Sequence, residues 1–295
     1  MRKSFLTAIL LFGFLCFPVL SQRDFSKVKI EVIPVKDGVY MLKGAGGNIE
    51  VLAGPEGILM VDTQYAQLAE KIESALKKLS SSHLKYVVIT HWHGDHVGGA
   101  EYFGRKAILI AHVNVRKRLS TEQKIFGRVI PPRPKEALPK ITYKKDMTIY
   151  LNGEKVVLKH FPTAHTDGDT VVFFKKSKVV HMGDLFFAGR FPFVDVDHGG
   201  DVVNLIKTLD EIIARLPSDV KIIPGHGSLS TLQDLIDYRN MLEKTTKFIR
   251  EKINAGKSLE QIKKEGFPDE WKKWGAGFIS AERWAELVYR SLTEK

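Results

Sequence analysis

The chain has 295 residues, of which 44% are hydrophobic and 27% are charged, and its formal net charge is +11. This composition excludes disordered, collagen-like and disulfide-rich classes, and the length suits one large domain or two small ones. The charge excess is local, because residues 105–145 hold twelve Lys or Arg and two acids. We interpret this segment as solvated surface, with guidance of an anionic substrate or contact with an anionic surface as alternatives. Nucleic-acid binding is not expected, because stacking aromatics do not alternate with the basic residues.

The first 21 residues have the pattern of a secretory signal. A basic start precedes an apolar run over 5–20, and small or modest residues follow where signal peptidase cuts. We expect cleavage after Ser21 and export to the periplasm or beyond. The apolar run is short for a membrane span, which disfavours an uncleaved anchor helix. After cleavage we expect no stable membrane span in the mature domain, 22–295. Cleavage would remove Cys16, the only cysteine, so any metal site must use His, Asp and Glu.

Short β-rich runs separated by turn residues open the mature chain and predict hairpins of a mostly antiparallel sheet. Helical apolar spacing then alternates with further apolar runs, which is typical of a layered α/β domain. The predicted strands are 29–35, 39–42, 49–53, 58–61, 84–90 and 107–111, and the predicted helices are 66–79, 99–103 and 113–119.

Residues 120–140 interrupt this pattern. Prolines at 131, 132, 134 and 139 keep the backbone extended and disfavour a helix or a central strand. We predict a surface loop of about twenty residues, which is long enough to suggest that it lines a substrate site.

A second β-rich half follows, again with helices after its strands. The predicted strands are 147–151, 156–161, 171–174, 179–182 and 221–223, with helices at 202–216, 232–254, 259–264 and 281–292. Two halves of similar size without a linker suggest one four-layered αββα domain, in which 255–295 forms a helical C-terminal extension.

One loop in this scheme carries metal-binding chemistry. The sequence His-Trp-His-Gly-Asp-His occupies residues 91–96, directly after a predicted strand. Imidazole and carboxylate are groups that divalent transition metals prefer. His91 and His93 point the same way from an extended backbone, and the following glycine lets Asp95 and His96 face a second point. We therefore predict that this loop supplies ligands to two adjacent metal ions.

Three later residues share the placement of this loop. His165, Asp184 and His226 each follow a predicted strand closely and lie near glycine, so their side chains can project from the edge of a sheet. This common position makes each of them a candidate ligand.

The pattern His-x-His-x-Asp-His, followed by His165, Asp184 and His226 in this order, resembles the metallo-β-lactamase superfamily over about residues 38–240. The resemblance implies an αββα sandwich with a dinuclear site at one edge of its two sheets. By motif position it implies that one metal is held by His91, His93 and His165, that the other is held by Asp95, His96 and His226, and that Asp184 bridges them.

One residue departs from the best-known lactamases with this histidine set. They have cysteine at the position of Asp184, whereas the aspartate found here resembles glyoxalase II. A carboxylate oxygen is a harder ligand than a thiolate, so we expect two divalent ions, with Zn²⁺ as the first choice and Mn or Fe as alternatives. The aspartate also weakens the assignment to β-lactams.

The resemblance implies an exported hydrolase. Our hypothesis is that a metal-bound hydroxide attacks an amide or ester-type carbonyl, such as that of a β-lactam or lactone, with Asp95 as the catalytic residue that orients it. The substrate would be a small molecule, with an anionic one suiting the basic segment. The alternatives are an iron-dependent redox enzyme of the same fold, a phosphodiesterase and a non-catalytic metal-binding envelope protein.

Four further residues are candidates for supporting or substrate-binding roles. Asp62 ends a strand, and we expect it to orient a ligand imidazole through the other ring nitrogen. His112 ends another strand, where it would support the site or cap the next helix. Arg190 is a candidate anchor for a substrate carboxylate, and His198, on the loop after Asp184, is a candidate substrate contact.

Overall fold

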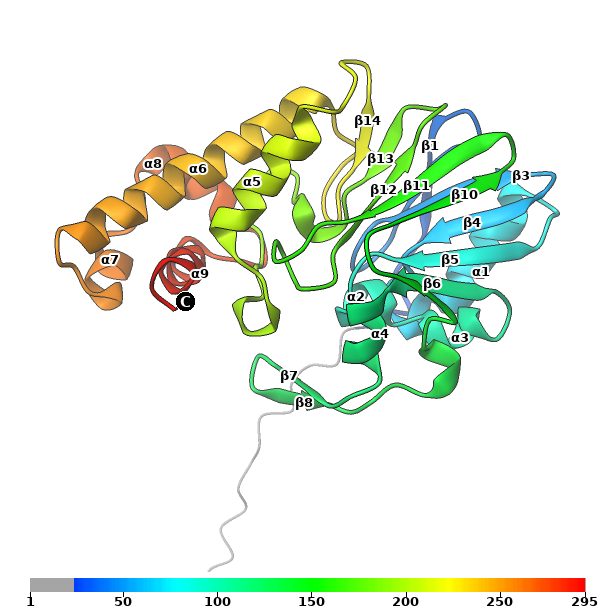
Figure 1. Ribbon diagram of the computed structural model, residues 1–295, viewed down its shortest axis with the longest axis horizontal. Coiled ribbons are helices and arrows are strands. Elements are labelled where there is room, and N and C mark those ends of the chain that lie inside the picture. The colour runs from blue at the N-terminus through cyan, green and yellow to red at the C-terminus, as the bar shows by residue number, and fades with distance from the viewer. Residues whose placement is uncertain (1–23, 295) are drawn as a thin grey trace, which may run out of the picture.

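The computed structural model describes residues 24–294, so the predicted signal segment lies outside the described residues. Two β-sheets face each other, and helices cover the outer face of each (Figure 1). The predicted αββα sandwich with a helical C-terminal region is therefore confirmed. Between residues 24 and 294, no helix has the length and hydropathy that a membrane span requires.

The first sheet has seven strands in the order β1-β2-β3-β4-β5-β6-β9. Its first four strands are antiparallel neighbours, whereas β4, β5, β6 and β9 run parallel, so the loops after these strands meet at one edge. The strands are β1 (Glu31–Lys36), β2 (Val39–Lys43), β3 (Ile49–Gly54), β4 (Gly57–Val61), β5 (Leu84–Ile89), β6 (Ile108–His112) and β9 (Ile141–Tyr143), and the helices are α1 (Ala69–Leu79), α2 (Gly94–Val97), α3 (Ala100–Gly104) and α4 (Val113–Leu119).

The second sheet has five strands in the order β10-β11-β12-β13-β14, of which only the last pair is parallel. The chain therefore changes sheet once, between β9 and β10. The strands are β10 (Asp146–Leu151), β11 (Glu154–His160), β12 (Thr170–Phe174), β13 (Val179–His181) and β14 (Lys221–Ile223), and the helices are α5 (Val202–Ile213), α6 (Leu232–Asn254), α7 (Leu259–Glu265), α8 (Asp269–Lys272) and α9 (Ala281–Thr293).

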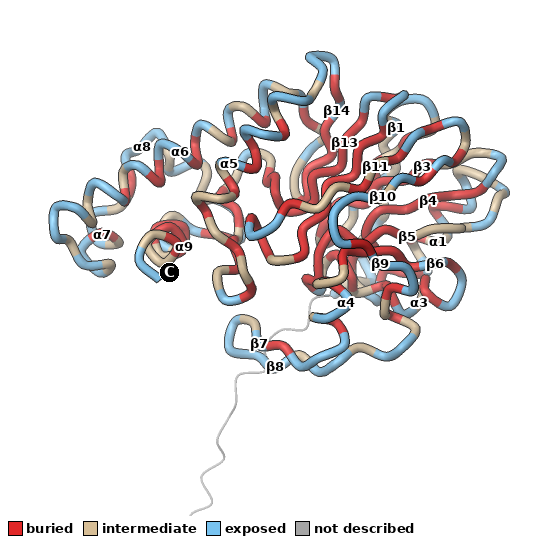
Figure 2. The backbone as a smooth tube through the Cα atoms, viewed as in Figure 1, coloured by how far each residue is buried: buried red, intermediate tan, exposed pale blue. Residues whose placement is uncertain are grey.

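Apolar side chains hold the four layers together. Side chains alternate between the two faces of a strand, and on β12 Val171 and Phe173 pack toward the helices while Val172 and Phe174 pack between the sheets. Because the central strands are buried on both faces, they are apolar along most of their length. Figure 2 shows this burial as continuous red strands beneath helices whose outer faces are exposed.

The expectation of an irregular loop over 120–140 was wrong in part. The structure places a small hairpin there, β7 (Gln123–Ile125) and β8 (Arg128–Ile130), which pairs with neither large sheet. Its turn residues Phe126 and Gly127 both have positive φ, at 49° and 74°, as a tight two-residue hairpin turn requires. The prolines at 131, 132 and 134 follow the hairpin, so they do not prevent it.

Candidate metal centre and substrate cavity

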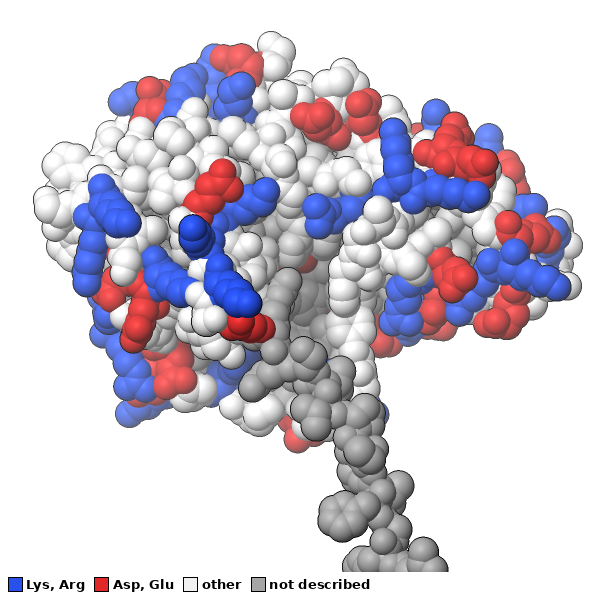
Figure 3. All heavy atoms as spheres, turned by 180° about the vertical axis from the view of Figure 1, so that it is seen from behind, with Lys and Arg blue, Asp and Glu red and all other residues white. Residues whose placement is uncertain are grey.

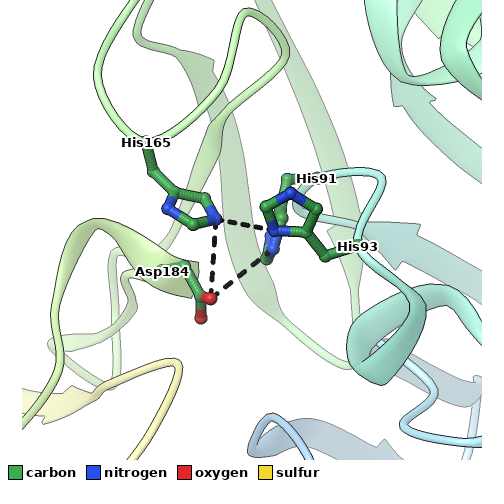
Figure 4. Close-up of side chains that lie close together, drawn as sticks. All are labelled: His91, His93, His165 and Asp184. Carbon is green, nitrogen blue, oxygen red and sulfur yellow. Dashed lines mark hydrogen bonds and ion pairs between the residues drawn. The ribbon is translucent and has the colours of Figure 1, made fainter. Parts of the chain in front are cut away.

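The seven side chains predicted as ligands converge at one edge of the sandwich. Four come from the loop after β5, and the other three follow β11, β13 and β14. Within each of two groups, the ligand atoms lie within 4.8 Å of one another: His91, His93, His165 and Asp184 form the first group, and Asp95, His96 and His226 form the second. Figure 4 shows the first group, in which His91 and His165 face Asp184 and His93 faces His165.

Asp184 lies between the two groups and faces each with one oxygen. Its Oδ2 atom is 3.5 Å from His165 Nε2 and 3.7 Å from His91 Nε2. Its Oδ1 atom is 3.0 Å from His96 Nε2 and 3.4 Å from His226 Nε2. This is the arrangement that a bridging carboxylate requires.

Hydrogen bonds on the outer side of the first group determine which imidazole nitrogens carry protons. His93 Nε2 donates to Asp195 Oδ2, and His165 Nδ1 donates to the Phe193 carbonyl oxygen, each over 2.8 Å. Both partners can only accept, so the inner nitrogens of the neutral rings carry lone pairs. These two lone pairs face each other over 2.9 Å. Two acceptors so close repel each other unless a cation lies between them.

Asp62 orients two further ligand imidazoles, one directly and one through Thr90. Its Oδ2 atom accepts from His96 Nδ1 over 2.7 Å. The same oxygen accepts from the Thr90 hydroxyl over 2.7 Å, and Thr90 Oγ1 lies 3.0 Å from His91 Nδ1, from which it accepts. The structure thus places Asp62 where the sequence predicted an orienting carboxylate, and it adds Thr90, which the sequence did not indicate.

The residues present fit divalent cations. His91 Nε2 and Asp184 Oδ1 are buried and have no hydrogen-bond partner of good geometry within residues 24–294. Buried polar atoms without partners are costly, and metal coordination would satisfy both. The two groups together offer five imidazole nitrogens and two carboxylates, a set that suits zinc and also manganese or iron.

The ionisation states of these side chains also suit the binding of a cation. Burial lowers the pKa of His91 well below its ordinary value and that of His165 to about 4, so both stay neutral, as metal ligands must. Burial opposes ionisation of Asp95, yet His96 and His226 lower its pKa to about 2. Burial opposes protonation of His226, yet Asp184 and Asp95 raise its pKa to about 9.

Two glycines allow the backbone to approach the ligands closely. A Cβ atom on Gly47 would lie 2.1 Å from His96 Cε1, and one on Gly225 would lie 2.1 Å from Asp184 Oδ1. Between them, the Asn48 side-chain amide donates to the carbonyl oxygens of Pro224 and Gly227, which flank His226. The glycine-rich turn at 44–47 therefore also forms a wall of the metal centre.

A cavity of about 1320 Å³ opens above the two groups. His93, Asp95, Asp184 and His226 contribute to its lining, together with residues of the β7–β8 hairpin and of the C-terminal segment. Arg190 lines it, as do Arg128 and Arg133, and none of the three forms an ion pair with another described residue. Among the described lining residues the acids are Asp95 and Asp184 alone, so the rest of the lining is basic or neutral.

The basic excess does not extend over the whole molecular surface. On the face shown in Figure 3, Lys and Arg side chains are interspersed with Asp and Glu.

His112 and His198 do not line this cavity. His112 stacks on His160 with ring centroids 3.6 Å apart, and its Nδ1 atom caps α4 by accepting from the Asn114 amide. His198 is buried against Trp92 and donates to Asp195 Oδ1 over 2.8 Å. Of the two roles considered for His198, the structure favours the supporting one: it donates to Asp195, which in turn orients His93.

Asp195 is the functional residue that sequence reasoning missed. Burial alone would raise its pKa, but hydrogen bonds from His198 and His93 hold it well below the ordinary value. Asp195 is thus an ionised carboxylate that accepts a hydrogen bond from the candidate ligand His93. No residue spacing indicates this role, because Asp195 lies in a loop 102 residues away from His93.

Comparison with known proteins identifies the family. Residues 43–226, more than half of the chain, match the model of the metallo-beta-lactamase superfamily. The chain belongs to this superfamily. Members of the metallo-β-lactamase superfamily are metal-dependent hydrolases that bind divalent metals, typically zinc. The resemblance predicted from the ligand motif is therefore confirmed.

Relatives of the chain lie at moderate sequence distance. Beta-lactamase-like protein 2 homolog of Caenorhabditis elegans is 25% identical over 233 residues, covering 77% of this chain and 68% of the relative. Hydroxyacylglutathione hydrolase GloC of Haemophilus influenzae is 29% identical over 174 residues, covering 56% of this chain and 78% of the relative. A double mutant of the sec-alkyl sulfatase PisA1 has the same fold, with a TM-score of 0.73 at 16% identity over 90% of this chain and 50% of that chain.

Proposed function

We propose that this member of the superfamily is a dinuclear hydrolase of amide or ester-type carbonyl bonds in small anionic substrates, with β-lactams and lactones as candidates. One observation carries the proposal: Asp184 lies between two complete ligand groups beneath a cavity whose unpaired charges are positive. The hydrolase GloC, which shares sequence with this chain, supports an acyl substrate. Zinc is the metal that we expect, with manganese or iron as alternatives.

Two bound divalent ions would supply an activated water and a Lewis acid for the carbonyl oxygen. Asp95 would then serve as the orienting base. It lines the cavity, and its low pKa keeps it ionised, so one carboxylate oxygen can accept a hydrogen bond from the attacking water. The same oxygen can pass the proton to the leaving group. Arg133 and Arg190 would hold a substrate carboxylate, because neither has another ionic partner among the described residues.

The test begins with metal content. Protein loaded separately with zinc, manganese and iron is analysed for bound ions and assayed with cephalosporins, lactones, thioesters, a phosphodiester and an alkyl sulfate. We expect two ions per chain and turnover of carbonyl substrates. Asp95→Ala should lower kcat at least about 100-fold, whereas Asp197→Ala, a change at an exposed carboxylate, should not. Full turnover by Asp95→Ala would refute the role of Asp95.

Other outcomes would replace the proposal by one of its alternatives. Turnover of the phosphodiester alone would identify a phosphodiesterase. Bound iron with a redox-active spectrum would identify a redox enzyme, and two tightly bound ions without any turnover would identify a metal-binding protein.

We further propose that the protein is exported. The support is the basic and then apolar pattern of the first 21 residues, which lie outside the described part of the chain. Mass spectrometry of the protein from its natural host should find a mature N-terminus at Gln22. Detection of intact Met1 in the cytoplasmic fraction would contradict export.

A further inference from the structure

Three phenylalanine rings form a continuous path from the metal ligands to the surface. The Phe193 ring lies 5.6 Å from the His93 ring, Phe126 lies 4.9 Å from Phe193, and Phe278 lies 5.8 Å from Phe126, all between centroids. All three rings line the cavity above the metal centre. We call this set the phenylalanine path.

The three rings come from separate parts of the chain. Phe193 is on the loop after β13, Phe126 is in the turn of the β7–β8 hairpin, and Phe278 precedes α9. Figure 1 shows this hairpin projecting beneath the sandwich toward the C-terminal helices. Three distant segments thus bring phenylalanine rings next to one another in the cavity lining.

The outer two rings are not required by the hydrophobic core. Phe126 is 52% exposed and Phe278 is 76% exposed, so each leaves most of its ring uncovered. Single exposed apolar residues are ordinary, but rings that touch one another inside a ligand cavity form a contiguous apolar surface, which is typical of a binding site.

The C-terminal segment is held in place beside this cavity. The Phe191 amide donates to the Trp274 carbonyl oxygen over 2.8 Å, and the Gly277 backbone packs against the Arg190 side chain. Both Trp274 and Gly277 lie beyond the residues that match the family model. The outer end of the cavity is therefore built by a part of the chain outside the matched region.

We propose that the phenylalanine path binds an extended acyl or alkyl chain of the substrate, so that the enzyme prefers carbonyl compounds with a long apolar group. This inference rests on the proposed function and specifies its substrate class. The inner end of the path meets His93, so a chain that follows it has its carbonyl group at the metal centre. The unpaired Arg128, also in the lining, can receive a negative group near the outer end.

A homologous series of 4-nitrophenyl esters, from acetate to decanoate, tests the preference on the metal-loaded full chain. We expect kcat/KM to rise by up to about fourfold for each added CH₂ that the path buries. Phe126→Ala and Phe278→Ala should lower kcat/KM for decanoate at least about tenfold and leave that for acetate unchanged. Two matched controls, Val129→Ala on the same hairpin and Tyr150→Ala on β10, remove exposed apolar groups outside the cavity lining and should have no effect. Rates that do not depend on chain length would overturn the proposal.

A binding measurement separates this inference from the proposed function. Calorimetry on the metal-free chain with butanoate, octanoate and dodecanoate should show affinity that increases with length and that is lost in Phe126→Ala. This result would support the path even if the loaded protein hydrolysed no ester, an outcome that would refute the function alone. Absence of length-dependent binding would overturn the inference. If the two Phe→Ala variants instead abolished binding to phosphatidylglycerol vesicles and kept the ester preference, the rings would be a membrane contact and the proposal would be wrong.

Discussion

Replacing Asp195 by asparagine tests whether outer hydrogen bonds hold the ligand imidazoles ready for metal. Asp195 accepts from His93 and from His198, each over 2.8 Å. A carboxylate can accept both bonds, whereas an amide offers one acceptor and one donor, so one of the two N–H groups would face an NH₂ group. His93 would then lose the partner that fixes its tautomer. Loss of such a supporting bond costs about 10- to 100-fold in metal affinity, or about 1.4–2.7 kcal/mol.

The measurement is a competition titration of Asp195→Asn against a chromophoric chelator. We expect one of the two ions to bind more weakly by that factor and the other to stay within about threefold of its original affinity, because Asp62 rather than Asp195 orients His96. Asp197→Asn is the matched control, since Asp197 lies two residues away and pairs with Arg290 at the surface. Unchanged affinity for both ions in Asp195→Asn would refute the reasoning.

Three further changes test other parts of the structure. Glu50 is buried on β3 and neither of its carboxylate oxygens has a hydrogen bond within residues 24–294, and burial, with a contribution from Glu154, raises its pKa well above the ordinary value. In the unfolded chain this carboxyl ionises near its ordinary pKa, so the free energy of unfolding should fall as pH rises from that value toward the folded pKa, by up to about 1.4 kcal/mol per pH unit. Urea titrations at pH 5 and pH 8 should show a smaller fall in Glu50→Gln. An identical fall in both proteins would contradict the assignment. Gly225→Ala should displace Asp184 and reduce the metal content found by mass spectrometry. Gly94→Ala, in the ligand loop at 91–96, should retain both ions, because an added Cβ there meets only the Arg133 side chain, at an ordinary contact distance of 3.9 Å. Equal metal content in the two variants would count against the close approach of Gly225 to Asp184. Removal of metal with EDTA should lower Tm by several degrees, because the ions bind the folded chain alone, and a Tm that differs by less than about 1 °C would argue against metal stabilisation.

Local signals in the sequence were sufficient for much of the fold. The helix predicted over 232–254 has the same bounds in the structure, where Thr231 and Asp234 form a capping box at its start. The strand predicted at 221–223 is also found unchanged. Capping residues, turn residues and apolar periodicity act over a few residues, so one sequence is enough to read them.

The ligand set was accessible for a similar reason. Each of its members lies close to the end of a strand, and the loop at 91–96 contains four of them at a spacing that lets one loop offer ligands to two metal ions. Glycines beside the later ligands added a second local signal. Gly225 is adjacent in sequence to His226, but its close approach to Asp184 is seen only in the structure.

What could not be predicted depends on contacts between distant segments. Asp195 supports His93 only because two sheets bring them together, and Phe126 meets Phe278 across 152 positions of sequence. His198 could not be assigned for the same reason, since its partner defines its role. The small hairpin at 123–130 was missed because two strands of three residues each give almost no periodic signal.

The single change of sheet between β9 and β10 has a consequence for how the protein acquires its ions. Each ligand group takes members from both sheets, so neither half of the chain holds a complete set, and the last member is residue 226. During synthesis neither ligand group is complete until nearly four-fifths of the chain has emerged and the second half has docked on the first. If the chain crosses a membrane unfolded, that docking happens at the destination. The ion supply of that compartment, more than the affinity of the ligands, would then decide which metal the enzyme carries.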